Sequence, residues 1–169
     1  MGPIDVDASI SGLDPALSKV SGLVDTSSIG TKTVTFAAYD KAGNASTKAC
    51  SYSVIYDWSG FFRPIDNLPV LNLVKSGSAV PVKFSLAGNQ GLDIFAAGYP
   101  RSATIACDAT ALVDTVEETV TAGQSSLQYD PRTDEYTYVW KTEKSWAGTC
   151  RQLVLLDDGT YHWALFKLK

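Results

Sequence analysis

The chain has 169 residues and a formal net charge of −4, and 45% of its residues are hydrophobic while only 19% are charged. These values allow a real core, and the low share of charged residues is typical of an extracellular all-β protein. Lys and Arg occur singly along the chain, without the basic cluster of nucleic-acid-binding proteins, so we expect no nucleic-acid partner. No apolar run approaches the ~20 residues that span a bilayer, which argues against membrane insertion.

The first 55 residues contain two alternating segments that predict a hairpin. Residues 32–38 and 49–55 place apolar side chains at every second position, the period of a β-strand. The loop Asp40–Asn44 between them consists largely of residues that tolerate turns. Upstream, Leu13–Leu17 predicts one helical turn with Asp14 as its cap and Pro15 at its first position. We expect about four strands in residues 1–55, too few for an independent core.

Residues 78–86 form the clearest alternating segment. Val80, Val82, Phe84 and Leu86 share one face, and Ala79, Pro81, Lys83 and Ser85 share the other. This pattern predicts a half-buried strand. Pro81 cannot donate a ladder hydrogen bond, so the strand should lie at a sheet edge or contain a bulge.

The last third of the chain also favours strands. Residues 135–141 alternate, and residues 151–156 and 160–168 flank Asp157-Asp158-Gly159, a strong hairpin signal. Residues 104–107 read as a short strand, residues 113–120 as strand or irregular structure, and residues 129–134 as a turn-rich link. No segment favours a helix longer than two turns. The chain therefore predicts an all-β, immunoglobulin-like sandwich.

The pattern changes near residues 55–58, which suggests two domains. Residues 1–55 form a partial Ig-like segment, and residues 56–169 are long enough for a sandwich of about seven strands. The incomplete first segment could expose strand edges, so self-association through residues 1–55 is a further prediction. We find no signal peptide at Met1-Gly2-Pro3 and expect any targeting segment to lie outside this sequence.

Three cysteines are present, Cys50, Cys107 and Cys150, and none shows the spacing of a zinc or redox motif. An odd number in a secreted chain indicates one disulfide and one remaining thiol. Cys107 and Cys150 both lie in the second domain, so we expect them to pair and Cys50 to remain free.

Residues 24–54 resemble the C-terminal half of bacterial Ig-like repeats of the HYR-like type. The resemblance rests on Val24–Phe36, on Tyr39–Lys48 with its Asp-Lys-Ala-Gly-Asn loop, and on Cys50–Val54. The early strands of such a repeat are missing from residues 1–23. In cysteine-bearing members the late cysteine often pairs with one further upstream, which would leave Cys50 unpaired here.

Residues 56–169 resemble the PxKF domain of secreted bacterial proteins. Pro81-Val82-Lys83-Phe84 matches the motif that names the family, and the similarity extends over four further segments: Tyr56–Pro64, Gly91–Phe95, Tyr136–Lys141 and Trp146–Arg151. The resemblance implies an Ig-like accessory module without catalytic residues.

Candidate catalytic and metal-binding residues all have a simpler structural interpretation. His162 is the only histidine and lies in a predicted strand without a marked nucleophile. The carboxylate pairs Glu117-Glu118 and Asp157-Asp158 are adjacent in sequence, so in a strand their side chains would point to opposite faces. Calcium would need a larger oxygen cluster than the scattered acidic and amide groups offer, namely Asp5, Asp7, Asp14, Asp40 and Asn44. We therefore expect no enzyme activity, no metal and no cofactor.

Aromatic residues are the best binding candidates. Trp58, Phe61 and Phe62 could stack on sugar rings, or they could pack between domains or close the end of the sandwich, which we favour. Tyr136, Tyr138 and Trp140 share a strand face and should belong to the core. Lys83 could form an isopeptide bond with an asparagine, but its face argues for solvent.

The sequence thus predicts a non-catalytic extracellular spacer or accessory module of a multidomain secreted or cell-surface protein. Its expected partners are neighbouring domains of the same polypeptide. The alternative is a carbohydrate-binding module of a secreted hydrolase, with polysaccharide as its ligand.

Overall fold

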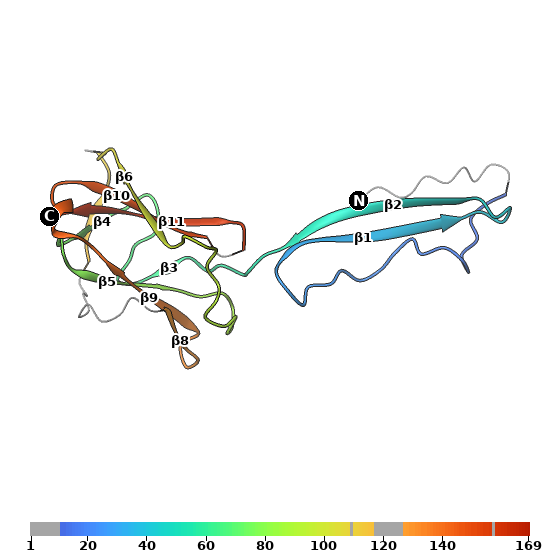
Figure 1. Cartoon of the computed structure of the whole chain (residues 1–169), viewed down its shortest axis with the longest axis horizontal. Helices are drawn as coiled ribbons and strands as arrows, with labels where there is room; N and C mark the ends of the chain where they lie inside the picture. Colours follow the sequence, from blue (N-terminus) through green and yellow to red (C-terminus); the bar gives the residue numbers. More distant parts are fainter. Residues whose placement is uncertain (1–10, 109, 117–126, 157) are drawn as a thin grey trace. The chain divides into compact units, whose positions relative to one another are not determined.

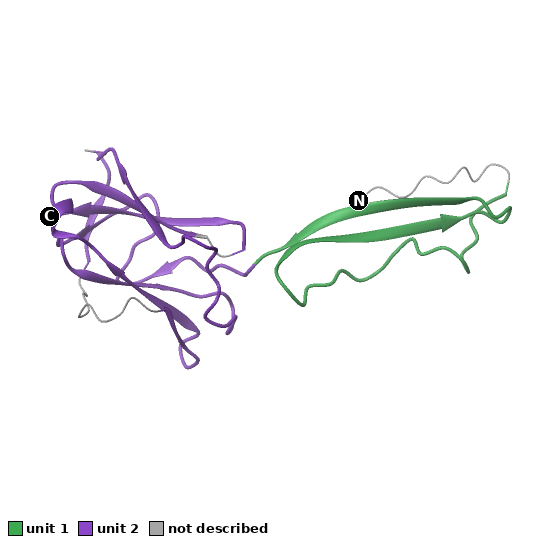
Figure 2. Ribbon diagram, in the orientation of Figure 1, with its two compact units in different colours: residues 1–55 green, residues 56–169 purple. Residues whose placement is uncertain are grey.

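The computed structural model describes residues 11–108, 110–116, 127–156 and 158–169. It divides into two compact units, residues 1–55 and 56–169 (Figure 2). This division falls where the sequence pattern changes.

The first unit is built on one long hairpin. β1 (Gly30–Tyr39) pairs antiparallel with β2 (Ala45–Val54), and Val34 lies opposite Cys50. The hairpin predicted from the alternation is confirmed. Among residues 11–55 these are the only two strands, joined by isolated bridges from Leu13 and Lys19 to the β1 side. The expectation of about four strands is therefore wrong for this part of the chain, because its leading segment makes only single bridges.

Asp14 caps a single turn, as predicted. Its carboxylate accepts the N–H of Ala16 at 2.9 Å and that of Leu17 at 3.3 Å. Its carbonyl accepts the N–H of Ser18 at 3.1 Å, which closes one helical turn. Asp14 thus satisfies donors that a helix N-terminus leaves without intrahelical partners.

The second unit is an all-β sandwich of two sheets, which confirms the predicted fold class (Figure 1). The first sheet has the order β6 (Arg101–Ile105), β10 (Cys150–Leu156), β11 (Tyr161–Leu168), β4 (Leu71–Val74) and β7 (Val113–Thr115). The second has the order β3 (Phe61–Phe62), β5 (Ala79–Phe84), β9 (Glu135–Lys141) and β8 (Leu127–Asp130). One 3₁₀ turn, Lys144–Trp146, precedes β10. The described part of this unit has nine strands, whereas the length of residues 56–169 suggested about seven.

The core fills the space between the two sheets. Its side chains come from alternate positions of the inner strands, which is the pattern that a sandwich requires. The fully buried members include Val80, Val82, Phe84, Tyr136, Leu153, Leu155, Ala164, Phe166 and Leu168. Tyr136 and Trp140 are buried and Tyr138 is partly buried against the core cluster, as expected for this strand.

β5 differs from its prediction in two respects. Ala79 and Pro81 are buried together with Val80 and Val82, so the strand is covered on both faces over most of its length. β5 lies between β3 and β9, but β3 pairs only with Phe84 and Lys83. Pro81 therefore lies where one side of β5 has no paired strand, and its missing N–H leaves no ladder bond unmade.

The predicted β10–β11 hairpin is confirmed, with Leu156 opposite Tyr161. The short strand expected at residues 104–107 is found at residues 101–105, so Cys107 follows the strand. Strand β7 agrees with the interpretation of residues 113–120 as far as residue 116, and Val120 lies outside the described residues.

Candidate functional site

Trp58 lies at one end of the sandwich, between the two sheets. Its indole stacks on the ring of His162 with centroids 4.0 Å apart and on Phe84 with centroids 5.0 Å apart. Phe61 meets the same indole edge-on at 5.2 Å and is only 6% exposed. Phe62 is half-buried. Trp58 and Phe61 thus pack against the core, in the manner of the plug considered from the sequence.

His162 belongs to a hydrogen-bonded group at the β10–β11 turn. Its Nε2 lies 2.7 Å from the hydroxyl of Thr160, and that hydroxyl donates to Asp158 at 2.6 Å. Because the single hydroxyl proton goes to the carboxylate, Nε2 carries its own proton and donates it to Thr160. To act as a general base towards Thr160, Nε2 of His162 would have to accept the hydroxyl proton of Thr160 instead. These two hydrogen bonds, from His162 to Thr160 and from Thr160 to Asp158, stabilise the turn and do not activate Thr160 as a nucleophile.

Burial lowers the pKa of His162 below its ordinary value, and the negative charge of Asp158 opposes this effect. Asp158 also accepts the N–H groups of Thr160 and Tyr56, which fastens the start of the unit to this turn. The imidazole is therefore neutral at pH 7.

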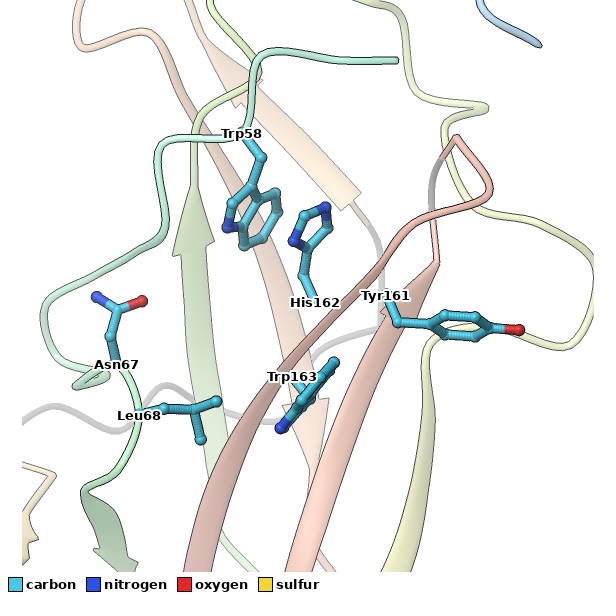
Figure 3. Close-up of a pocket in the computed structure, with 6 residues that line it drawn as sticks. All are labelled: Trp58, Asn67, Leu68, Tyr161, His162 and Trp163. Atoms are coloured by element: carbon cyan, nitrogen blue, oxygen red, sulfur yellow. The ribbon is translucent and has the colours of Figure 1, made fainter. Parts of the chain in front are cut away.

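A pocket of about 260 Å³ opens beside this group (Figure 3). It is lined by Trp58, Asn67, Leu68, Tyr161, His162 and Trp163. Figure 3 shows the rings of Trp58 and His162 face to face, Leu68 reaching towards Trp163, and the ring of Tyr161 pointing away from the others. The exposed fractions of Leu68 and Trp163 are 47% and 39%.

The sequence named Trp58 and His162 but did not bring them together, and it missed the contribution of Asn67 and Leu68. The alternation of β11 does place Tyr161 and Trp163 on one face and His162 on the other. The loop that carries Asn67 and Leu68 has no periodic signal.

The aspartates in the described residues mainly hold turns. The carboxylates of eight of them accept backbone N–H groups: Asp14, Asp25, Asp40, Asp108, Asp114, Asp130, Asp134 and Asp158. Hydrogen bonds from Asn44, and then from Ser11, lower the pKa of Asp40 to about 2. Asp40 and Asn44 bind each other at 2.7 Å, so they act as turn residues.

In the part of the chain that the structure describes, no group of three or more His, Cys, Asp or Glu side chains could hold a metal ion. Asp5, Asp7, Glu117, Glu118 and Asp157 lie outside the described residues. Lys83 is half-buried opposite Thr137 of β9, so the expectation that its face lies in solvent is only partly right.

The predicted disulfide between Cys107 and Cys150 is present, and Cys50 is free. The bridge joins residues 43 positions apart and fastens the segment after β6 to the start of β10. A structural disulfide is compatible with an oxidising, extracellular environment. Across the described ranges, no helix is long and apolar enough to cross a membrane.

No protein-family model matches the chain, and no curated protein matches it either. The resemblances to the PxKF domain and to HYR-like repeats therefore remain predictions from the motifs.

Proposed function

We propose that the chain is a non-catalytic accessory module of a multidomain extracellular protein, and that its second unit acts as a load-bearing spacer between neighbouring domains. The proposal rests on the positions of Tyr56 and Lys169 within this unit. Tyr56 bonds to the turn that precedes β11, and Lys169 follows the last residue of β11, so the two residues lie at opposite ends of this strand.

Each of these ends is fastened by hydrogen bonds. The N–H of Tyr56 binds Asp158, just before β11 begins. At the far end, the N–H of Lys169 donates to Val74 at 2.9 Å, and the carbonyl of Lys169 accepts the N–H of Ser76 at 2.8 Å. β11 spans the distance between them, about 27 Å for eight extended residues.

Tension between residues 56 and 169 would therefore act along β11. Its hydrogen bonds to β10 and β4 lie across the strand. Under such shear these bonds share the load and must break together, whereas peeling breaks them one at a time. The Cys107–Cys150 bridge additionally holds β10 to the segment that follows β6.

The alternative, a carbohydrate-binding module that uses Trp58, Phe61 and Phe62, has less support in this form. Trp58 and Phe61 pack against the core, which leaves little ring face for a sugar. Self-association through residues 1–55 remains a prediction, to be checked by comparing the molar mass of the chain with that of a variant lacking these residues.

Single-molecule pulling tests the spacer function. The first geometry attaches the chain through its two ends. The second attaches residue 169 and a cysteine placed at the exposed Ser145, in a Cys50→Ser background. Ser145 lies in the connection whose Gly148 and Thr149 hydrogen-bond to Leu168, so this second geometry peels β10 from β11. We expect a clearly higher unfolding force for the second unit in the first geometry. Equal forces in the two geometries would refute the load-bearing role.

A further inference from the structure

The pocket beside β11 exists because β4 does not run the full length of its neighbour. β4 pairs with β11 only from Leu71 opposite Leu165 onwards. Residues 161–164 of β11 pair with β10 on one side, and on the other side no described strand accompanies them.

Two of the peptide groups in this part of β11 point towards the gap. The carbonyl of Leu165 accepts a bond from Asn72 on the β4 side, whereas the N–H of Leu168 donates to Thr149 on the β10 side. The backbone N–H and C=O groups of successive residues in a strand point to opposite sides, so the groups of Tyr161 and Trp163 point to the β4 side, as the carbonyl of Leu165 does. These N–H donors and C=O acceptors border the pocket.

The gap is held open by specific bonds. The side chain of Asn67 accepts the N–H of Phe61 at 2.9 Å and donates to its carbonyl at 2.8 Å, which binds this loop to β3. The N–H of Val70 then donates to the carbonyl of Asn67 at 3.2 Å and closes a turn. Pro69 has no N–H with which to extend β4 towards residue 163. The loop is thereby kept away from the first residues of β11.

The chemistry of the lining selects a neutral ligand. None of its six residues is acidic, Lys or Arg, and burial keeps His162 uncharged at pH 7. Leu68 and the indole of Trp163 offer apolar surface, while the amide of Asn67 keeps one donor and one acceptor beyond its bonds to Phe61. The volume of about 260 Å³ is just below the range of drug-sized sites, so it suits one ring.

We propose that this pocket binds one pyranose ring of a neutral polysaccharide, with the apolar face of the sugar on Trp163 and its hydroxyls on Asn67 and the edge of β11. A sugar ring combines one apolar face with several hydroxyls, which matches this lining. An extended peptide fits less well, because the free edge of four residues measures only about 13 Å and presents outward peptide groups at two of them. This binding role goes beyond the spacer function and does not depend on it.

Affinity electrophoresis of the full chain tests the proposal, with soluble xylan, glucomannan and mixed-linkage β-glucan as neutral probes and polygalacturonate as an acidic probe. We expect at least one neutral polysaccharide to retard the chain and polygalacturonate to have no effect. Trp163→Ala should weaken binding about tenfold or more, since it removes the stacking surface. Leu92→Ala is the control and should bind like the parent chain, because Leu92 is 59% exposed and is not one of the six residues that line the pocket.

Leu68→Asp provides an independent check should Trp163→Ala fold poorly. Leu68 is 47% exposed on a loop, so a charge there should leave the fold intact and abolish sugar binding. The proposal is overturned if no neutral polysaccharide retards the chain, if Leu68→Asp binds like the parent, or if Leu92→Ala weakens binding as much as Trp163→Ala does. Retardation by polygalacturonate alone would also overturn it. The pulling forces are measured without sugar, so failure here and failure of the spacer function are distinguishable.

Discussion

The indole of Trp58 lies 4.0 Å from the imidazole of His162, and the two rings are only 8° from parallel. The stack continues through Phe84, at 5.0 Å from Trp58, to Tyr136, at 5.4 Å from Phe84. It therefore begins on β11 of one sheet and ends on β5 and β9 of the other. Trp58 lies in the segment at the start of the second unit, and its ring is part of this stack. The start of the domain therefore belongs to its core.

Replacing Trp58 with Ala should therefore destabilise the whole second unit. The change removes three ring contacts and leaves a cavity between the sheets, so we expect the free energy of unfolding to fall by about 3 kcal/mol. Phe62→Ala is the control, because Phe62 is half-buried and lies outside the stack; we expect a loss of about 1 kcal/mol. Urea unfolding followed by near-UV circular dichroism measures both. Equal losses in the two variants would contradict the role given to the stack.

The stack also makes stability depend on pH. The folded pKa of His162 lies below its ordinary value of 6.5, mainly because of burial, so the unfolded chain binds the proton more readily. The stability that this group contributes is complete above the unfolded pKa and is lost as the pH falls from about 6.5 towards the folded pKa. The carboxyl groups with a lowered pKa affect the free energy of unfolding only at lower pH, outside this interval.

We therefore expect the parent chain to lose stability between pH 7.5 and 5.5, and His162→Gln to lose clearly less over the same interval. Denaturant unfolding at several pH values gives both curves. Parallel curves for the two proteins would show that His162 is not the titrating group.

The sandwich could be predicted because its long strands carry the signal in their own side chains. β9 and the β10–β11 hairpin alternate over seven or eight residues, and the turn between β10 and β11 contains Gly159 with a φ of +90°. The pairing of Cys107 with Cys150 followed from the domain division. β3 and β4 could not be found, since two to four residues are too short to establish a period.

The pocket could not be predicted for a different reason. It depends on the loop around Asn67 turning away from β11, and this turn is set by hydrogen bonds to Phe61 in another sheet. Likewise, the contact of Trp58 with His162 joins residues that are far apart in sequence. Local patterns carry no information on such long-range contacts.

The disulfide should contribute strongly to the stability of the second unit. It closes a loop of 43 residues, for which the chain-entropy estimate is about 4 kcal/mol. We expect Cys107→Ser/Cys150→Ser to lower the free energy of unfolding by about 2–4 kcal/mol, with hydrogen exchange in β1 and β2 unchanged.

Non-reducing peptide mapping provides the control, with one reactive thiol expected at Cys50. A disulfide between Cys50 and either Cys107 or Cys150 would contradict both the pairing and the separation of the two units.

Asp40 should hold the hairpin of the first unit together. Its carboxylate accepts the N–H groups of Ala42 and Asn44 at 2.9 and 2.8 Å, and Gly43 supplies the positive φ that the turn needs. With a folded pKa of about 2 and an ordinary value of 3.8, Asp40 stabilises the hairpin above pH 4, and this contribution is lost as the pH falls towards 2.

Asp40→Ala should accelerate hydrogen exchange of the amides in β1 and β2 at pH 7. Asp40→Asn should accelerate it less, because an amide oxygen can still accept both N–H groups. Exchange in β9 and β10 is the internal reference and should not change, since these strands belong to the other unit. Equal exchange rates in the parent chain and Asp40→Ala would show that the strand ladder alone maintains the hairpin.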